Sequence, residues 1–326
     1  MNFPSPSSGP RRARFPQDIP HITGLVELCF ADVLDYPSRR MLREVRTVAR
    51  MGPMAWKISR LLGVVRKEEW LSAYVWEEQG RIVANANVTH RGGEEPDWLM
   101  SNVAVHPDYR RRGIARSLVE YAVNGLHSRG VGDIYLQVDA ANRSAVDIYD
   151  NVGFAKIACR MAWQRAGGEN RLARPAGARS FQVAERKSAE WMEEYELWRS
   201  VSPHGTAWNT PLKKKALRPS MWKGMERMLA GEQEKHFLAR RGELVEAALA
   251  AVGRASGWEG VLIQREGSGG KVEADLLHAA WDVFSPGQRA LLETTPAVSE
   301  HTLEKLGFRK RRTFIWMRYT FPGGAP

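Results

Sequence analysis

The sequence is poor in cysteine and has no long apolar run. Its 326 residues include two cysteines, Cys29 and Cys159, which excludes a disulfide-rich secreted scaffold. Both lie in apolar segments, so we expect small core residues. No segment reaches the roughly 18 apolar residues of a membrane span. The polar first residues lack the apolar part of a signal peptide, so residues 1–14 are predicted to be a flexible tail and the protein to be cytoplasmic.

Common phosphate-binding and nucleic-acid signatures are also missing. Neither Gly-x-Gly-x-x-Gly nor Gly-Lys-Ser/Thr occurs, which excludes a dinucleotide fingerprint and a P-loop. The net charge is +11, but no zinc finger, aromatic RNA-binding signature or helix-turn-helix accompanies it, so no specific nucleic acid is predicted. The densest basic segment, residues 39–67, has apolar residues at helical spacing. It indicates two amphipathic helices with a solvated basic face; an acidic acceptor, a ligand phosphate or nucleic acid are alternatives.

One segment has a much more specific pattern. Residues 103–105 form a short apolar strand that ends at Pro107, because proline cannot continue a β-ladder. The arginines 110–112 follow, and Gly113 opens an amphipathic helix that extends to about residue 129. The start of a helix presents unpaired N–H groups and the positive end of the helix dipole. The segment therefore predicts an anion site, and a pyrophosphate fits it.

This pattern resembles the GNAT superfamily of acyl-CoA-dependent N-acyltransferases. In that family Arg/Gln-x-x-Gly-x-Gly/Ala cradles the pyrophosphate of coenzyme A, and residues 110–115 read Arg-Arg-Arg-Gly-Ile-Ala. A second block also matches, because the strand 134–138 is followed by Asn142, Tyr149 and the pair Gly153-Phe154. The resemblance covers roughly residues 15–165.

The resemblance implies acetyl-CoA as cosubstrate and no metal. The pantetheine arm would pair with the backbone of residues 103–105, between two splayed central strands, and a bulge near Ser101–Asn102 would separate them. Asn142 would bind the pantetheine or cap the next helix. The implied cofactor-binding residues are Val103, Ala104, Val105, Arg110, Arg111, Arg112, Gly113, Ile114, Ala115, Arg116 and Asn142.

Tyr149 is the predicted catalytic residue. In the family a tyrosine four residues before Gly-Phe protonates the departing coenzyme A thiolate, and Tyr149 stands at that position. The alternative is a half-buried aromatic residue without a chemical role. No base is assigned, because residues 98–105 include no titratable side chain. Glu94, Glu95 and Asp97 lie just upstream and could act through water.

The second half repeats the pattern in a degenerate form. Residues 166–179 read as a linker, and the hairpin 72–86 resembles residues 236–248. Leu303 stands where the first copy has its tyrosine, and residues 265–271 are rich in glycine but off the family spacing. They form either a flexible loop or a phosphate-binding nest.

We therefore predict an α/β (α+β) protein with two GNAT-like domains, each a mostly antiparallel sheet with flanking helices and a splayed central strand pair. The catalytic domain spans residues 15–165 and the degenerate one 180–326. The predicted activity is transfer of acetyl from acetyl-CoA to a primary amine of a small molecule, peptide or protein by direct attack. The alternative is a non-catalytic acyl-CoA-binding regulatory module. The predicted partners are acetyl-CoA and the amine acceptor, and no membrane association is predicted. The protein is predicted to be a monomer whose tandem domains form a pseudo-dimer.

Overall fold

The computed structural model describes most of the chain. It covers residues 8–322 apart from 33, 35, 62–71, 92–96, 130, 168–180, 204–205, 207–216, 221, 223–224, 226, 228, 230, 255–256, 269–270 and 282–288. The predicted linker 166–179 and the residues Glu94 and Glu95 therefore fall almost entirely outside the described residues.

The chain forms two compact units, and each is assembled from separate segments of the sequence. Unit 1 consists of residues 1–137, 143–156 and 317–326, and unit 2 of residues 138–142 and 157–316. The units do not follow the continuous ranges 15–165 and 180–326, because the strand that begins at Ala155 pairs within unit 2. Those ranges stay a prediction about domains.

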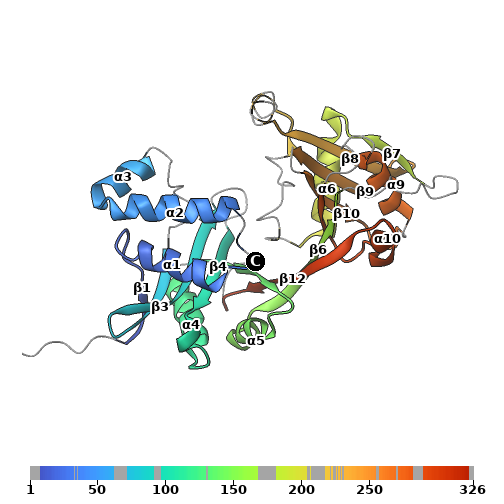
Figure 1. The fold of residues 1–326 in the computed structure, drawn as a ribbon. Helices are drawn as coiled ribbons and strands as arrows, with labels where there is room; N and C mark the ends of the chain where they lie inside the picture. The colour runs from blue at the N-terminus through green and yellow to red at the C-terminus, as the bar shows by residue number, and fades with distance from the viewer. Residues whose placement is uncertain are drawn as a thin grey trace, which may run out of the picture. The chain divides into compact units, whose positions relative to one another are not determined.

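Unit 1 is a mixed sheet with helices on both faces (Figure 1). Its elements in chain order are β1 (Gly9–Arg12), α1 (Ile19–Cys29), α2 (Tyr36–Arg50), α3 (Pro53–Leu61), β2 (Ser72–Glu78), β3 (Arg81–Arg91), β4 (Asp97–Val105), η1 (Pro107–Tyr109), α4 (Ile114–His127), β5 (Ile134–Asp139) and α5 (Arg143–Val152). The strand order is β1-β2-β3-β4-β5-β12, in which β12 (Arg309–Tyr319) is the last strand of the chain. Neighbours from β1 to β4 are antiparallel, and β4 and β5 are parallel.

Alternation along β2 decides which helices cover which face. Ala73 and Val75 pack in one apolar cluster with Ile22 of α1 and Leu42 of α2, whereas the ring of Tyr74 lies edge-on against Tyr121 of α4, 5.9 Å away. Successive strand residues point to opposite faces. Helices α1 and α2 therefore cover one face of the sheet and α4 covers the other (Figure 1). The basic segment that the sequence predicts to be helical forms α2 and α3 as far as residue 61.

Part of the predicted tail is an ordered strand. Residues 9–12 pair with β2 as β1, and the Arg11 guanidinium lies 2.6 Å from an Asp18 oxygen and 2.5 Å from a Glu77 oxygen. Burial alone would raise the pKa of Asp18, but hydrogen bonds from Arg11 and from the Arg14 N–H outweigh it and lower that pKa. The prediction of a flexible tail is therefore wrong for residues 9–14, because composition does not reveal these partners.

Unit 2 contains the other strands of the same 12-stranded mixed sheet. Its elements are β6 (Ala155–Arg165), β7 (Gln182–Glu185), η2 (Ser188–Glu190), α6 (Trp191–Val201), β8 (Gln233–Arg241), β9 (Leu244–Arg254), β10 (Gly257–Gln264), α9 (Lys271–Trp281), β11 (Ala290–Thr294), α10 (Glu300–Lys305) and β12 (Arg309–Tyr319). The strand order is β12-β6-β11-β10-β9-β8-β7. Strands β10 and β11 are parallel. The large mixed sheet with flanking helices confirms the predicted fold class.

The element succession of unit 1 recurs in unit 2. Both contain a hairpin that turns at a left-handed glycine, Gly80 with φ 78° and Gly242 with φ 61°. In both, the next strand carries a tryptophan near its start, and that tryptophan pairs with the first residue of a parallel strand, Trp98 with Ile134 and Trp258 with Ala290. The predicted repeat of the hairpin is thus present in the structure.

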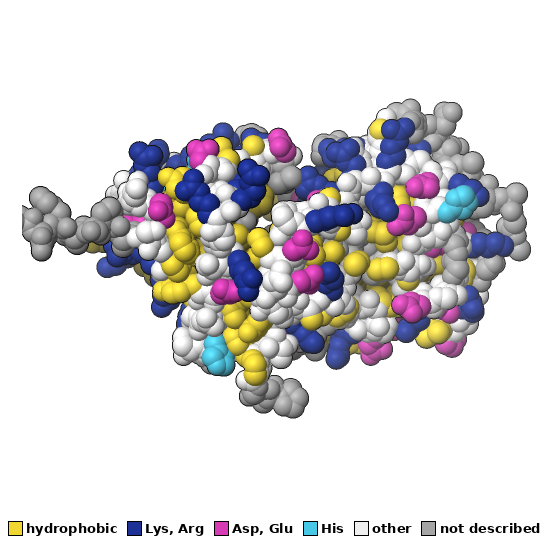
Figure 2. All heavy atoms as spheres, turned by 90° about the horizontal axis from the view of Figure 1, so that it is seen from below, with side chains coloured by type: hydrophobic (Ala, Val, Ile, Leu, Met, Phe, Trp, Pro, Cys, Tyr) yellow, Lys and Arg dark blue, Asp and Glu magenta, His cyan; other side chains and the backbone are white. Residues whose placement is uncertain are grey.

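The surface carries side chains of both charges, and both cysteines reach it at least in part. Lys and Arg side chains are interspersed with acidic and apolar ones on the face that Figure 2 presents. Cys29 is partly exposed and Cys159 is exposed, and both are free thiols. The prediction of a core residue is wrong for Cys159, because it stands on an outward-facing position of β6. In the part of the chain that the structure describes, no helix is both long and apolar enough to cross a bilayer.

Candidate functional site

The central strands β4 and β5 pair only where they begin. Their register runs from Trp98 opposite Ile134 to Met100 opposite Leu136 and ends there. Toward β3, in contrast, β4 stays paired as far as Val105. Beyond Met100, β4 no longer pairs with β5, so a different extended chain can pair with it there.

A β-bulge lies in β4 where this pairing ends. Asn87 of β3 lies opposite Ser101 and Asn85 lies opposite Ala104, so two residues of β4 face one residue of β3. Asn102, inside this step, has φ 50°, which is the left-handed region that few non-glycine residues adopt. An extra residue twists and bends its strand. The bulge that the sequence predicts near Ser101–Asn102 is confirmed.

The turn after β4 leads directly into α4. Gly113 occupies the N-cap with φ 75°, and no side chain caps the first N–H groups of the helix. A Cβ built on Gly113 would meet no atom within 4 Å, so the space in front of these groups is open. Arg111 also has a left-handed backbone, with φ 62°, a strain of about 1 kcal/mol or more. Together these features form a shaped backbone site for an anion.

The arginines of the turn brace it. Arg110 donates from Nε to the Val105 carbonyl at 3.1 Å. Arg112 donates to the Asp108 carbonyl at 2.9 Å and lies over the Tyr109 ring. Arg116 pairs with Glu120 at 2.8 Å on the exposed side of α4. All of them are exposed. The guanidinium groups of Arg110 and Arg112 therefore hold the shape of the turn and place positive charge around it.

The other predicted cofactor-binding residues differ in how far their side chains are exposed. Ile114 and Ala104 are buried, with 5% and 4% of their surface exposed, so only their backbone can serve a ligand. Val103, Val105 and Ala115 are partly exposed. Asn142 directly precedes α5, and its own N–H donates to the Asp139 carbonyl at 2.9 Å.

Tyr149 is a buried residue of α5 in unit 1. It is 8% exposed, and its ring lies edge-on to Phe154 at 5.8 Å. Burial raises the pKa of Tyr149 above the ordinary value for a phenol. The side chain therefore stays protonated throughout the neutral range, which is the form that a proton donor needs. For the base, β4 offers no titratable side chain from Trp98 to Val105, and the first one after it is His106.

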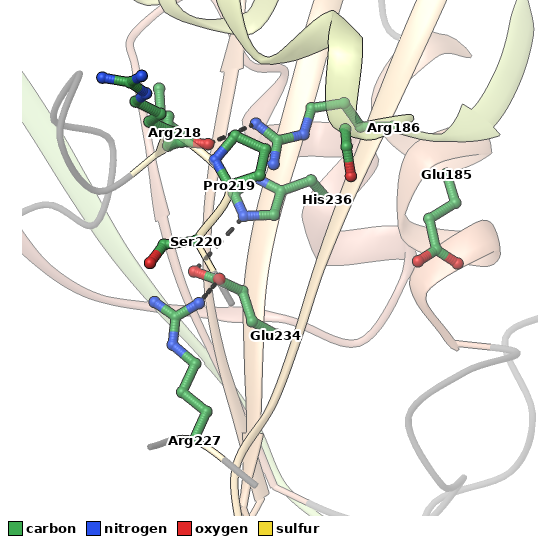
Figure 3. A pocket seen from close by; sticks show the side chains of 10 residues that line it. Glu185, Arg186, Arg218, Pro219, Ser220, Arg227, Glu234 and His236 are labelled. Carbon is green, nitrogen blue, oxygen red and sulfur yellow. Dashed lines mark hydrogen bonds and ion pairs between the residues drawn. The ribbon is translucent and has the colours of Figure 1, made fainter. Parts of the chain in front are cut away.

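Unit 2 holds a separate cavity of 230 Å³ that the sequence did not suggest. Its lining includes Arg227 and His236, and both contact the Glu234 carboxylate (Figure 3). Behind them the buried Glu194 lies 2.8 Å from His236 and 2.9 Å from Arg186. These charged groups neutralise one another within the wall of the cavity. They build a polar cluster beside this cavity of unit 2.

The sequence of unit 1 is similar to those of known acetyltransferases. The model of the Acetyltransferase (GNAT) family matches residues 40–154. The ribosomal protein bS18-alanine N-acetyltransferase of Escherichia coli K12 is 41% identical over an alignment of 108 residues, and this alignment covers 28% of this chain and 73% of that protein.

Two solved structures extend over nearly the whole chain. A GCN5-related N-acetyltransferase from Sphaerobacter thermophilus has a TM-score of 0.55 at 14% identity and covers 97% of each chain. A tandem GNAT protein from the clavulanic acid biosynthesis pathway has a TM-score of 0.51 at 15% identity and covers 97% of this chain and 99% of that one. At these identities the likeness concerns the fold.

Proposed function

Because the chain belongs to the GNAT acetyltransferase family, we propose that unit 1 of this N-acetyltransferase transfers acetyl from acetyl-CoA to a primary amine. One observation carries the proposal: strands β4 and β5 stop pairing after Met100, and the same β4 leads through a short turn into the uncapped helix start at Gly113. The first feature suits an extended thioester arm and the second suits a pyrophosphate. Coenzyme A joins these two groups in one molecule.

We assign the binding roles accordingly. The backbone N–H groups at the start of α4 hold the pyrophosphate, with Arg110–Arg112 and Arg116 adding positive charge around it. The pantetheine arm lies in the opening and pairs with the backbone of residues 103–105, as an added strand would. Asn142 stays a predicted contact of the same arm.

The proposed chemistry is direct attack. The amine nitrogen forms a bond to the thioester carbonyl carbon, the C–S bond breaks, and the thiolate takes a proton from the Tyr149 phenol. The amine loses its proton to water, because β4 carries no base between Trp98 and Val105. Holding both reactants in one cleft provides much of the acceleration.

For the acceptor, we propose the amine of a peptide or protein ahead of a small-molecule amine. The support is the name of the Escherichia coli relative, which specifies an alanine of a ribosomal protein. The test is release of free thiol from acetyl-CoA by the full chain, with peptides that begin with alanine compared with small amines. Turnover with such a peptide is expected. Tight acetyl-CoA binding without thiol release with any amine would instead favour a non-catalytic acyl-CoA-binding module.

We also propose that unit 2 is a degenerate copy without a cofactor cleft. Its strands β10 and β11 pair from Trp258 to Leu262, two residues further than the first copy. Leu303, at the position of the missing tyrosine, is buried in the core of unit 2. Arg265 donates its Nε to the Val245 carbonyl and an Nη to Ser200.

Isothermal titration of the full chain is therefore expected to give one acetyl-CoA site per chain. A closed strand pair leaves no room for the pantetheine arm in unit 2. The Gly113→Val variant is the control and should show no saturable binding in the same concentration range. Two sites in the wild type, one of them surviving in the variant, would assign the second site to unit 2 and contradict the degenerate copy.

A further inference from the structure

Two asparagines interrupt an otherwise apolar stretch of β3. Asn85 has 0% and Asn87 has 3% of its surface exposed. Within the part of the chain that the structure describes, the Oδ1 of Asn85 has no hydrogen-bond partner. A buried amide that is only half satisfied costs free energy. Its presence in the core therefore calls for a compensating role.

Asn85 bonds to the bulge of the neighbouring strand. Its Nδ2 donates to the carbonyl oxygen of Asn102 at 2.8 Å, and Asn102 is the residue with the left-handed backbone inside the bulge. An extra residue removes backbone groups from the regular ladder, and a carbonyl that leaves the ladder can be held by a side-chain donor instead. The Asn85 amide is that donor.

Both asparagines lie on the face of the sheet that α1 covers. Asn85 pairs with Val75, and Asn87 pairs with Ala73. Val75 and Ala73 belong to the cluster that packs against α1, and directly opposed residues of antiparallel strands share a face. The two amides therefore form a polar row beneath α1, with Asn85 Nδ2 3.5 Å from Asn87 Oδ1.

Unit 2 provides an internal comparison. Counted from the bulge of each hairpin, the pairs Val75–Asn85 and Ala73–Asn87 correspond to Leu238–Ala248 and His236–Ala250. Alanine thus replaces both asparagines. There β9 and β10 pair without a register shift, and β10 stays paired with β11 through Leu262. Unit 2, which lacks the two amides, therefore has no bulge between β9 and β10 and no opening between β10 and β11.

We propose that Asn85 is a positioning residue for the acetyl-CoA cleft. By holding the Asn102 carbonyl, its amide keeps the bulge that separates β4 from β5, and so keeps the backbone of residues 103–105 available to the pantetheine arm. Asn85 acts through β4 and touches no reacting atom. The inference rests on the proposed function of unit 1.

The test separates the two halves of the coenzyme. The variants Asn85→Asp and Asn85→Ala are titrated at pH 8 with acetyl-CoA and with adenosine 3′-phosphate 5′-diphosphate, which carries the pyrophosphate but lacks the pantetheine. Aspartate has nearly the same shape, but an ionised carboxylate cannot donate to a carbonyl. Asn87→Ala is the matched control, because it removes a buried amide from the same strand and face. The melting temperature of each unliganded variant measures any general loss of stability.

Both Asn85 variants are expected to bind acetyl-CoA about tenfold more weakly, corresponding to about 1.4 kcal/mol. Their affinity for the nucleotide should stay within about twofold of the wild-type value, because the turn at Gly113 is untouched, and Asn87→Ala should retain both affinities. Equal weakening by Asn85→Ala and Asn87→Ala, or loss of nucleotide affinity along with that for acetyl-CoA, would overturn the role of Asn85. If the wild type itself bound neither ligand, the proposed function of unit 1 would fail first.

Discussion

Replacing Tyr149 by phenylalanine is expected to lower kcat about 100-fold or more, while the Kd for acetyl-CoA stays within about twofold. Phenylalanine keeps the ring and its edge-on contact with Phe154 but removes the proton that we assign to the departing thiolate. The measurement is thiol release under saturating acetyl-CoA, together with titration of the coenzyme. A drop in kcat at constant Kd marks an interaction that is made in the transition state.

The pH dependence of kcat is an independent test of the role of Tyr149. The phenol acts in its protonated form, so its contribution is present below its pKa and is lost as the pH rises through that pKa. Burial raises the pKa of Tyr149, so the wild type is expected to keep this contribution beyond pH 10, about the ordinary value of tyrosine. In Tyr149→Phe the alkaline loss assigned to the phenol should be absent.

Tyr121→Phe is the matched control for Tyr149. Tyr121 is 39% exposed on α4, where its ring contacts Tyr74, and its loss should leave kcat unchanged. If Tyr149→Phe kept the wild-type kcat as well, the phenol would be a packing residue and protonation of the thiolate would pass to water.

Replacing Gly113 by valine is expected to weaken acetyl-CoA binding about 100-fold, which corresponds to about 2.7 kcal/mol. The left-handed backbone, with φ 75°, is costly for a β-branched residue. The new side chain would also enter the open space before the first N–H groups of α4, where we place the pyrophosphate. Isothermal titration calorimetry measures the effect.

Gly80→Val separates these two contributions. Gly80 lies in the β2–β3 hairpin with φ 78°, and its built Cβ also meets no atom within 4 Å. Valine there imposes a similar backbone strain far along the chain from the turn, so acetyl-CoA affinity should stay within about twofold. Comparable weakening by both variants would mean that strain in unit 1, rather than occupation of the anion site, explains the result for Gly113.

The turn at Gly113 was predictable because its information is local. A strand that ends at proline, a run of arginines and a glycine at the start of an amphipathic helix are adjacent in sequence, and each has a direct conformational meaning. The bulge near Asn102 was predicted from the family resemblance alone, since no residue type at that position requires it. The structure adds a contact to it, because the Asn85 amide donates to the Asn102 carbonyl from 17 positions away.

Asn85 itself escaped prediction for a related reason. An asparagine inside a strand violates the apolar pattern of β3, and that violation was the available signal. On its own, however, it does not reveal which carbonyl the amide meets. Likewise, the ion pairs that order residues 9–12 join Arg11 to Asp18 and Glu77, and the sequence does not indicate that these charges meet.

The sequence by itself determined the class of fold, the glycine turn that opens α4 and the tyrosine of α5, because periodicity and short motifs act over a few neighbouring residues. The tertiary structure decided the composition of the two compact units, since β6 and the last strand, β12, take their places by pairing with strands that are distant in the chain. It also decided that β4 and β5 separate while β10 and β11 do not. Strand register is a property of pairs, and a single strand's residues do not specify it.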